Sequence, residues 1–148
     1  DAFSRIMSSN PRLNLVILGD GECRADLQDQ AAKLGISGRV ILPGRVSNPV
    51  IWFREARLCV VSSRVEGFPN VLLQMMSQCE RVVSTTCAGG IDRIEGLLTC
   101  PPGDAARLAR KIESGLNLDD TSEIRRKFDS FLDDNTMNKF VDRIIKLS

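Results

Sequence analysis

Histidine is absent from this 148-residue sequence. Its absence excludes the commonest general base and the commonest metal ligand of proteins, together with any Ser/His or Cys/His nucleophile pair within the chain. The five cysteines stand at positions 23, 59, 79, 87 and 100 without a Cys-x-x-Cys pair, so we expect no metal site. We expect reduced, mainly structural thiols, as in a cytosolic protein, with Cys59 acting as a small core residue.

The sequence also lacks an excess of charge of either sign, because 20 Lys and Arg residues balance 19 Asp and Glu residues. A nucleic-acid-binding domain usually carries a basic patch, so we expect no nucleic-acid partner. No apolar run approaches the roughly 20 residues that cross a bilayer, and no signal peptide is visible. We therefore expect a cytoplasmic protein. Residues 1–148 suit one domain, and the absence of an initial Met predicts that it is a fragment of a longer protein.

Short apolar runs alternate with helical patterns along the chain. Strands are predicted at 13–18, 39–42, 58–61, 81–84 and 97–99, and helices at 22–34, 50–54, 70–78, 104–116, 122–132 and 137–146. Strands that are apolar without alternation suit a parallel sheet covered by helices on both faces. The fold class is therefore α/β, with one parallel sheet flanked by helices. The residues predicted to be buried in its central strands are Leu15, Val16, Ile17, Val60, Val61, Val82 and Val83, and Trp52 and Phe53 are also expected in the core.

Ligands of such sheets bind outside the carboxyl ends of the strands. The loops at those ends are 19–22, 43–45, 62–70 and 85–92. In the third loop, Glu66 can accept hydrogen bonds from hydroxyl groups, Gly67 allows close approach to the backbone, and Pro69 suits the first turn of the next helix. The N–H groups at a helix start bind anions. The loop thus suits a ligand with phosphate and hydroxyl groups, although a Gly-Pro turn with a solvated Glu66 is an equal alternative.

The run Ser62-Ser63-Arg64-Val65-Glu66-Gly67-Phe68-Pro69-Asn70 resembles the signature of retaining glycosyltransferases of the group 1 type. Leu18-Gly19-Asp20-Gly21-Glu22, Arg39 to Gly44, Val82 to Gly90 and Pro102-Gly103-Asp104 are similar to further segments of that family, in the same order. The resemblance covers residues 13–116. It implies a Rossmann-like domain that forms the C-terminal, donor-binding half of a GT-B fold.

This resemblance implies that Glu66 is the catalytic residue that faces the donor sugar. The family's second Glu, which holds the ribose, is replaced by Gln74, a weaker partner for hydroxyl groups. The residues expected to bind the nucleotide sugar are Gly19, Gly21, Gly44, Arg45, Arg64, Gly67, Phe68, Pro69, Asn70 and Gln74. Solvated or structural roles remain open for Arg45 and Arg64, and Gln74 has the alternative of a bystander on its helix. No cofactor or metal is implied, since the nucleotide sugar is a substrate.

In a family member the acceptor binds to an N-terminal domain, which this chain does not include. The resemblance therefore implies transfer, with retention, to a saccharide or lipid-linked acceptor, in polysaccharide biosynthesis, by a full-length protein that can contact the inner face of the membrane. Residues 1–148 alone are expected to be inactive. Two alternatives stay open: a non-catalytic module that binds nucleotide or a protein partner, and a nucleotide-sugar epimerase with the same fold.

Overall fold

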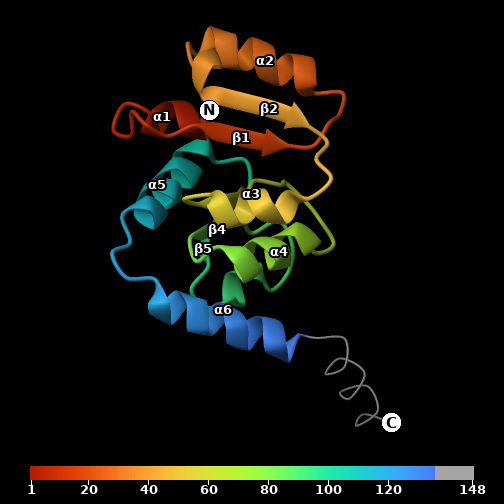
Figure 1. Cartoon of the computed structure of the whole chain (residues 1–148), viewed down its shortest axis with the longest axis vertical. Coiled ribbons are helices and arrows are strands. Elements are labelled where there is room, and N and C mark those ends of the chain that lie inside the picture. The colour runs from red at the N-terminus through yellow and green to blue at the C-terminus, as the bar shows by residue number, and fades with distance from the viewer. Residues whose placement is uncertain (136–148) are drawn as a thin grey trace.

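The computed structural model describes residues 1–135 (Figure 1). The elements, with 3-10 helices labelled η, are α1 (Ala2–Ile6), β1 (Leu15–Leu18), α2 (Arg24–Lys33), η1 (Ser37–Arg39), β2 (Val40–Gly44), α3 (Pro49–Glu55), β3 (Cys59–Val61), α4 (Asn70–Gln78), β4 (Val82–Thr85), η2 (Ile91–Arg93), β5 (Leu98–Cys100), α5 (Ala105–Leu116) and α6 (Ser122–Asp134). Helix α1 was not predicted from the sequence. The helix predicted at 137–146 lies outside the described residues.

Side chains and glycines account for several element boundaries. Asn48 caps α3 by accepting from the N–H of Val50 at 3.1 Å, with a proline in the first turn. Asp104 caps α5 by accepting from the N–H of Arg107 at 2.8 Å. Gly35, with φ +68°, follows α2 in the left-handed conformation common after a helix end. Local chemistry therefore begins and ends these helices within two residues of the predicted positions.

All strand pairs are parallel, which confirms the α/β class with parallel strands flanked by helices. The strands form two sheets, however, rather than the single sheet predicted. β1 pairs with β2, with Val16 opposite Ile41. The second sheet has the order β3-β4-β5, with Val83 opposite Leu98. In the described part of the chain no strand joins β1 to β3, and a cleft separates them.

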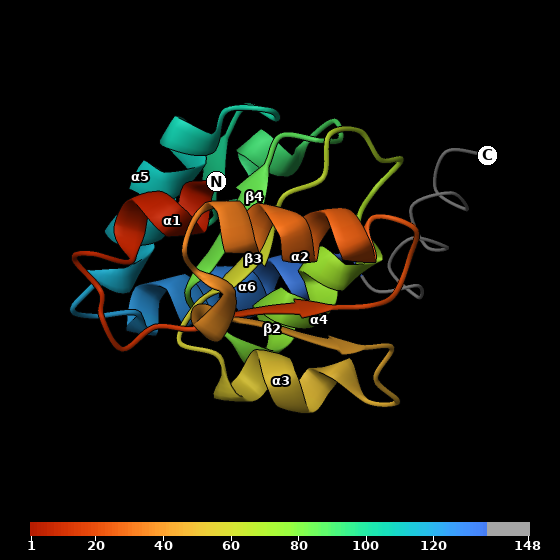
Figure 2. The ribbon, with the colours of Figure 1, turned by 90° about the horizontal axis from the view of Figure 1, so that it is seen from above.

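Helices cover the sheets from two sides. Buried residues of α1, α2 and α5 belong to one apolar cluster, and those of α3, α4 and α6 belong to another. Neighbouring residues of β4 show the division, because Val82 packs into the second cluster and Val83 into the first. Figure 2 shows α2 and α3 on opposite sides of β2. The architecture is therefore a three-layer α/β/α arrangement.

The predicted burial is confirmed in β3 and β4 for Val61, Val82 and Val83, which are 5%, 1% and 0% exposed. It is wrong for four residues, all of which border the cleft between the sheets: Leu15, Val16, Ile17 and Val60. Val16 is 36% exposed and the other three are half-buried. Phe53 is buried as predicted, whereas Trp52 is 39% exposed beside the same cleft. These errors have one physical cause: within residues 1–135, no strand pairs with β1 or β3 on the side that faces the cleft.

Candidate functional site

Two of the predicted ligand loops meet at the carboxyl ends of β1 and β2. The N–H of Gly19 donates to the carbonyl of Gly44 at 2.9 Å. Gly19 has φ +109° and Gly44 has φ +81°, which are conformations that favour glycine. Next to them, the N–H of Gly21 donates to the carboxylate of Asp20 at 3.1 Å. The two glycines therefore hold the first pair of loops together through their backbones.

The other two loops meet around Glu66. The N–H of Glu66 donates to the carbonyl of Cys87 at 2.9 Å. Thr85 is a buried residue, 2% exposed, and its hydroxyl donates to the carbonyl of Ser63 at 2.6 Å. The hydroxyl of Ser63 in turn donates to the Glu66 carboxylate. The loop after β4 thus fixes the loop after β3, and Ser63 orients the predicted catalytic carboxylate.

The start of α4 follows Glu66. Pro69 is fully buried and occupies the N-cap position, one residue before the predicted first-turn position. A proline side chain accepts no hydrogen bond, so the first-turn N–H groups at Asn70 and Val71 have no side-chain cap. Gly67 has no heavy atom within 4 Å of the place where a Cβ would stand, and Phe68 is 37% exposed. The helix start is therefore open to an anionic ligand.

The remaining predicted polar residues, Arg45, Arg64 and Gln74, are exposed. Neither arginine forms an ion pair within residues 1–135. Gln74 lies on α4, about one turn after its first residue Asn70, and its main-chain carbonyl accepts from the hydroxyl of Ser77 at 2.8 Å. All three side chains are thus accessible from solvent.

A cavity of about 980 Å³ forms the cleft between β1 and β3. Gly19 and Arg45 line it beyond one strand, and Ser62 and Ser63 line it beyond the other. Both pairs of loops therefore contribute residues to the lining of the cleft. The other predicted site residues do not line it: Gly21, Gly44, Arg64, Glu66, Gly67, Phe68, Pro69, Asn70 and Gln74.

Sequence reasoning did not assign roles to Ser63, Thr85 and Cys87. Ser63 and Thr85 donate their hydroxyl hydrogens, and Cys87 contributes its main-chain carbonyl. All three lie in the two loops that the sequence marked for a ligand. Their positions were therefore recognisable, but their mutual contacts depend on the pairing of β3 with β4.

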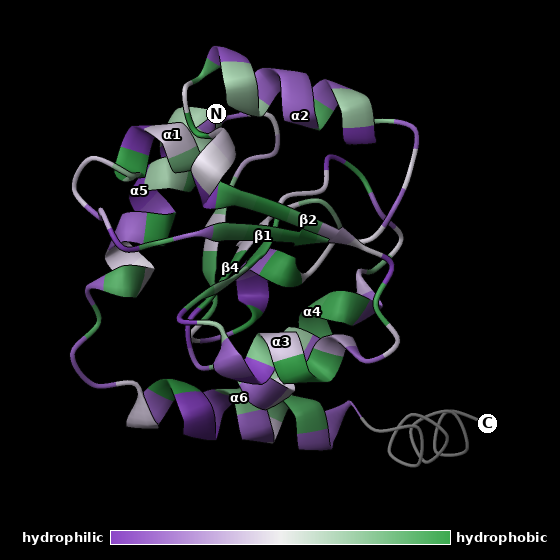
Figure 3. Ribbon diagram, turned by 45° about the horizontal axis from the view of Figure 1, so that its top comes forward, coloured by the Kyte–Doolittle hydropathy of each residue, from purple (hydrophilic) through white to green (hydrophobic). Residues whose placement is uncertain are grey.

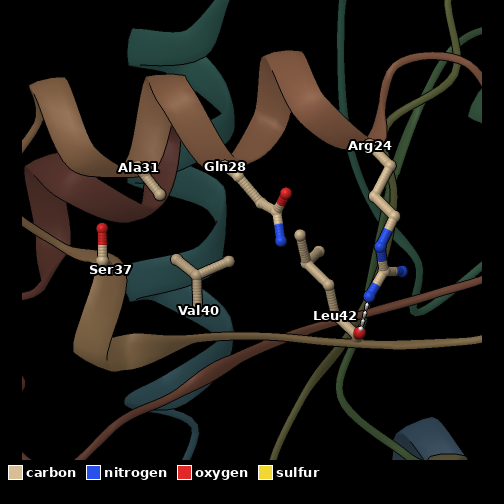
Figure 4. A pocket seen from close by; sticks show the side chains of 6 residues that line it. All are labelled: Arg24, Gln28, Ala31, Ser37, Val40 and Leu42. Carbon is tan, nitrogen blue, oxygen red and sulfur yellow. Dashed lines mark hydrogen bonds between the residues drawn. The ribbon is translucent and has the colours of Figure 1, made fainter.

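A second, smaller pocket of about 320 Å³ lies between α2 and β2 (Figure 4). In it, Arg24 crosses from α2 to β2 and donates to the carbonyl of Leu42 at 2.7 Å. Gln28 points toward β2 beside this contact. No residue predicted for the ligand site lines this pocket. The hydrogen bond from Arg24 to Leu42 holds α2 against β2.

Metal-binding clusters and membrane-spanning helices are two further features that residues 1–135 do not contain. Within that range, no three Cys, Asp or Glu side chains lie together as a metal ion would require. No helix in the same range is long and apolar enough to cross a membrane.

Comparison with known proteins gives consistent matches. Residues 1–117 match the family model described as glycosyl transferases group 1. The chain is 36% identical over 89 residues to an uncharacterized glycosyltransferase of Methanocaldococcus jannaschii, covering 60% of this chain and 22% of that protein. It is 37% identical over 107 residues to the lipopolysaccharide core biosynthesis glycosyltransferase LpsE of Rhizobium meliloti, covering 70% of this chain and 31% of the relative.

The fold is similar to that of Anabaena HepE, solved in complex with UDP. The TM-score is 0.80 at 18% identity, over 99% of this chain and 44% of that one. The chain thus spans less than half the length of each of these three proteins. Since the family model covers most of the sequence, including the loop of Glu66 and the start of α4, the chain belongs to the group 1 glycosyl transferases.

Proposed function

We propose that this chain is the donor-binding domain of a retaining glycosyltransferase that uses a nucleotide sugar. The observation that carries the proposal is the arrangement around Glu66. Its carboxylate accepts from Ser63, its backbone N–H donates to Cys87, and only Gly67, Phe68 and Pro69 separate it from the uncapped start of α4. A carboxylate that accepts hydrogen bonds from sugar hydroxyls, beside N–H groups that donate to phosphate oxygens, suits both parts of a nucleotide sugar.

The leaving group of the reaction is a nucleoside diphosphate. Transfer breaks the bond between the anomeric carbon and a phosphate oxygen, so negative charge develops on the diphosphate. The start of α4 and the free guanidinium groups of Arg64 and Arg45 stabilise that charge. Gln74 accepts from the ribose hydroxyls, and Glu66 contacts the donor sugar. This assignment uses no cofactor and no metal ion.

The rest of the full-length protein supplies the acceptor site in this proposal. The acceptor is a saccharide or a lipid-linked saccharide, and the transfer reaction takes place in the cytoplasm at the inner face of the membrane. The Rhizobium meliloti relative is named for lipopolysaccharide core biosynthesis, which supports a saccharide acceptor. The UDP in the Anabaena structure supports a nucleotide ligand for this fold.

A second candidate function is a module that binds nucleotide without catalysis. The observation in its favour is Gln74, an uncharged side chain at the position where the family's second Glu is expected. A neutral amide forms weaker hydrogen bonds with hydroxyl groups than a carboxylate does. The same experiment tests both candidates.

In that experiment, purified full-length protein is incubated with UDP- and GDP-sugars and with saccharide and lipid-linked acceptors. Release of nucleoside diphosphate is measured, and the anomeric configuration of the product is determined by NMR. We expect transfer with retention, and none from residues 1–148 alone. Inversion would contradict the retaining mechanism, nucleotide binding without transfer would favour the non-catalytic module, and turnover by residues 1–148 would contradict the separate acceptor domain.

A further inference from the structure

Arg24, the first residue of α2, links the loop after β1 to the end of β2. Its main-chain N–H donates to the carbonyl of Gly21 at 3.1 Å. Its guanidinium group donates to the carbonyl of Leu42 in β2 at 2.7 Å (Figure 4). The same group stands 3.9 Å from the carboxylate of Asp20. One residue is therefore in contact with both of the loops that form the first pair at the candidate site.

The guanidinium group also lies against Gly44, the last residue of β2. A Cβ built on Gly44 would stand 3.7 Å from Nη1 of Arg24. The carbonyl of Gly44 accepts from the N–H of Gly19 at 2.9 Å, and this bond holds the two loops together. Arg24 thus lies next to the backbone bond that sets the spacing of the loops.

The first half of α2 has few apolar contacts to hold it in place. Among the ten residues of the helix, all of them described, only Ala31 is buried, and it lies in the second half. Figure 3 shows hydrophilic turns along α2 and hydrophobic strands in β1 and β2. The cavity of about 320 Å³ between α2 and β2 shows that the helix is not packed closely on the strand. Arg24 therefore supplies a restraint that apolar packing provides for most helices.

Of the two contacts made by the guanidinium group, the hydrogen bond to Leu42 is the stronger restraint. Its donor is charged, and bonds of this kind are shorter and stronger than neutral ones. The contact with Asp20 is longer, and the side chains of Arg24 and Asp20 are 40% and 58% exposed. Water and salt weaken such an exposed ion pair. The spacing of the loops therefore depends mainly on the bond from Arg24 to Leu42.

We propose that Arg24 is a positioning residue for nucleotide binding, which holds the loop after β1 and the end of β2 at a fixed spacing. Arg24 lines the small cavity behind the loops, whereas Gly19 and Arg45 line the cleft, so Arg24 acts through the loops and not on the ligand. Loops that are already in place lower the conformational cost of binding. This inference rests on the proposed function, in which Gly19, Gly21, Gly44 and Arg45 bind the nucleotide sugar.

Arg39 provides a matched control at the other end of the same two strands. It directly precedes β2, and its guanidinium group donates to Oδ1 of Asn14 at 2.9 Å and to the main-chain carbonyl of Leu13. Both of these residues directly precede β1. Arg39 and Arg24 are both half-buried, and each donates to a main-chain carbonyl. Because ligands bind at the carboxyl ends of parallel strands, Arg39 stabilises the domain at the end away from the site.

Hydrogen–deuterium exchange on the full-length protein tests the proposal without a ligand. We expect the peptide of residues 17–22 to exchange faster in Arg24→Gln than in the wild type, because the bond from Gly19 to Gly44 opens more often. Arg39→Gln is expected to leave this peptide unchanged. Equal exchange in the wild type and Arg24→Gln would overturn the proposal, and so would equal acceleration in the two variants.

Calorimetry with UDP and GDP on the same proteins provides the second measurement. We expect Arg24→Gln to weaken nucleotide binding about three- to tenfold, because the loops occupy the binding arrangement for a smaller fraction of the time. Arg39→Gln is expected to bind as the wild type does. Both variants are expected to lower the melting temperature, so a purely structural role would not separate them. Equal affinities of the two variants would overturn the proposal.

Arg24→Lys separates position from charge, because lysine keeps the positive charge without the planar guanidinium group. We expect it to recover only part of the affinity lost in Arg24→Gln. Full recovery, with exchange of residues 17–22 still faster than in the wild type, would assign the effect to charge alone and overturn the proposal. Failure of the wild type to bind either nucleotide would contradict the proposed function instead, and the exchange measurement would still decide whether Arg24 holds the loops.

Discussion

The backbone N–H of Glu66 donates to the carbonyl of Cys87 at 2.9 Å. This bond joins the loop after β3 to the loop after β4, at the carboxyl ends of two paired strands. The position of the Glu66 carboxylate is therefore set by the sheet and not by its own loop alone. Ser63 adds a second restraint by donating its hydroxyl hydrogen to the carboxylate.

The first prediction concerns Glu66→Ala in the full-length protein. If Glu66 contacts the sugar, the transfer rate is expected to fall about 100-fold or more. This is the usual effect of removing one polar group that stabilises a transition state. Nucleotide affinity is expected to stay nearly unchanged. Steady-state kinetics and calorimetry with the nucleoside diphosphate measure the two effects. Glu123→Ala is the control, because Glu123 is an exposed residue on α6 that pairs with Lys127.

Ser63→Ala gives the corresponding test of a positioning residue. Ser63 acts through Glu66, so we expect a smaller loss in kcat than for Glu66→Ala and little change in KM. Removing both side chains is expected to cost no more than removing Glu66 alone, because the two act as one unit. Additive losses in the double variant would show that Ser63 does not work through Glu66.

The third prediction concerns Gln74→Glu. A hydrogen bond to a charged group contributes about 1.5–3 kcal/mol, so a carboxylate at this position is expected to tighten nucleotide binding by roughly tenfold or more. Calorimetry on the full-length protein measures the affinity. Gln78→Glu adds the same charge one turn further along α4 and is the control for a general effect of charge. Unchanged or weaker binding by Gln74→Glu would remove the ribose assignment.

Gly67 provides a test of ligand access. The space around its Cβ position is empty within 4 Å and its φ is not positive, so Gly67→Ala is expected to change the free energy of unfolding by less than about 0.5 kcal/mol. Nucleotide-sugar affinity is expected to fall, since the added methyl group lies where the ligand approaches. Unchanged affinity would place the ligand elsewhere.

The matched control for this substitution is Gly96→Ala. Gly96 has φ +85°, and a Cβ there would stand 3.2 Å from Cγ2 of Ile124 in α6. A left-handed conformation costs a non-glycine residue about 1–2 kcal/mol, so this variant is expected to lose at least that much stability in urea unfolding. Its site residues are unaffected, so its nucleotide-sugar affinity is expected to stay unchanged under conditions where it remains folded.

The last prediction concerns the thiols, all of which are free. Cys23 is exposed, whereas Cys59, Cys79, Cys87 and Cys100 are buried. Brief alkylation followed by mass spectrometry is therefore expected to label Cys23 alone, and unfolding is expected to expose all five. Rapid labelling of any of the other four in the folded protein would contradict the described core.

Among the buried thiols an order of reaction is also expected. The hydrogen bond between Cys59 and Cys79 raises the pKa of the Cys59 thiol and lowers the pKa of the Cys79 thiol. Burial raises the pKa of Cys100. Because the thiolate is the reactive form, Cys79 is expected to react before Cys59 and Cys100 during prolonged alkylation near neutral pH.

The sequence by itself determined the α/β class, the parallel strands and the loops that carry the candidate site. Apolar runs of four to six residues, separated by helical patterns, have few other compact solutions. The same reasoning correctly buried Val61, Val82 and Val83, because β3 and β4 lie beside each other under two layers of helices. Composition and motif suffice where a residue's neighbours come from adjacent segments of this chain.

Only the tertiary structure decided the division into two sheets and the exposure of Leu15, Val16, Ile17 and Val60. An apolar pattern predicts which side chains are buried, but whether they are buried depends on the strand that lies beside them. The contacts of Ser63 and Thr85 with the Glu66 loop are of the same kind, because hydrogen bonds between loops form only after β3 and β4 have paired. Periodicity along one segment contains no record of which other segment lies across a sheet edge, and at β1 and β3 that neighbour decides both burial and the shape of the site.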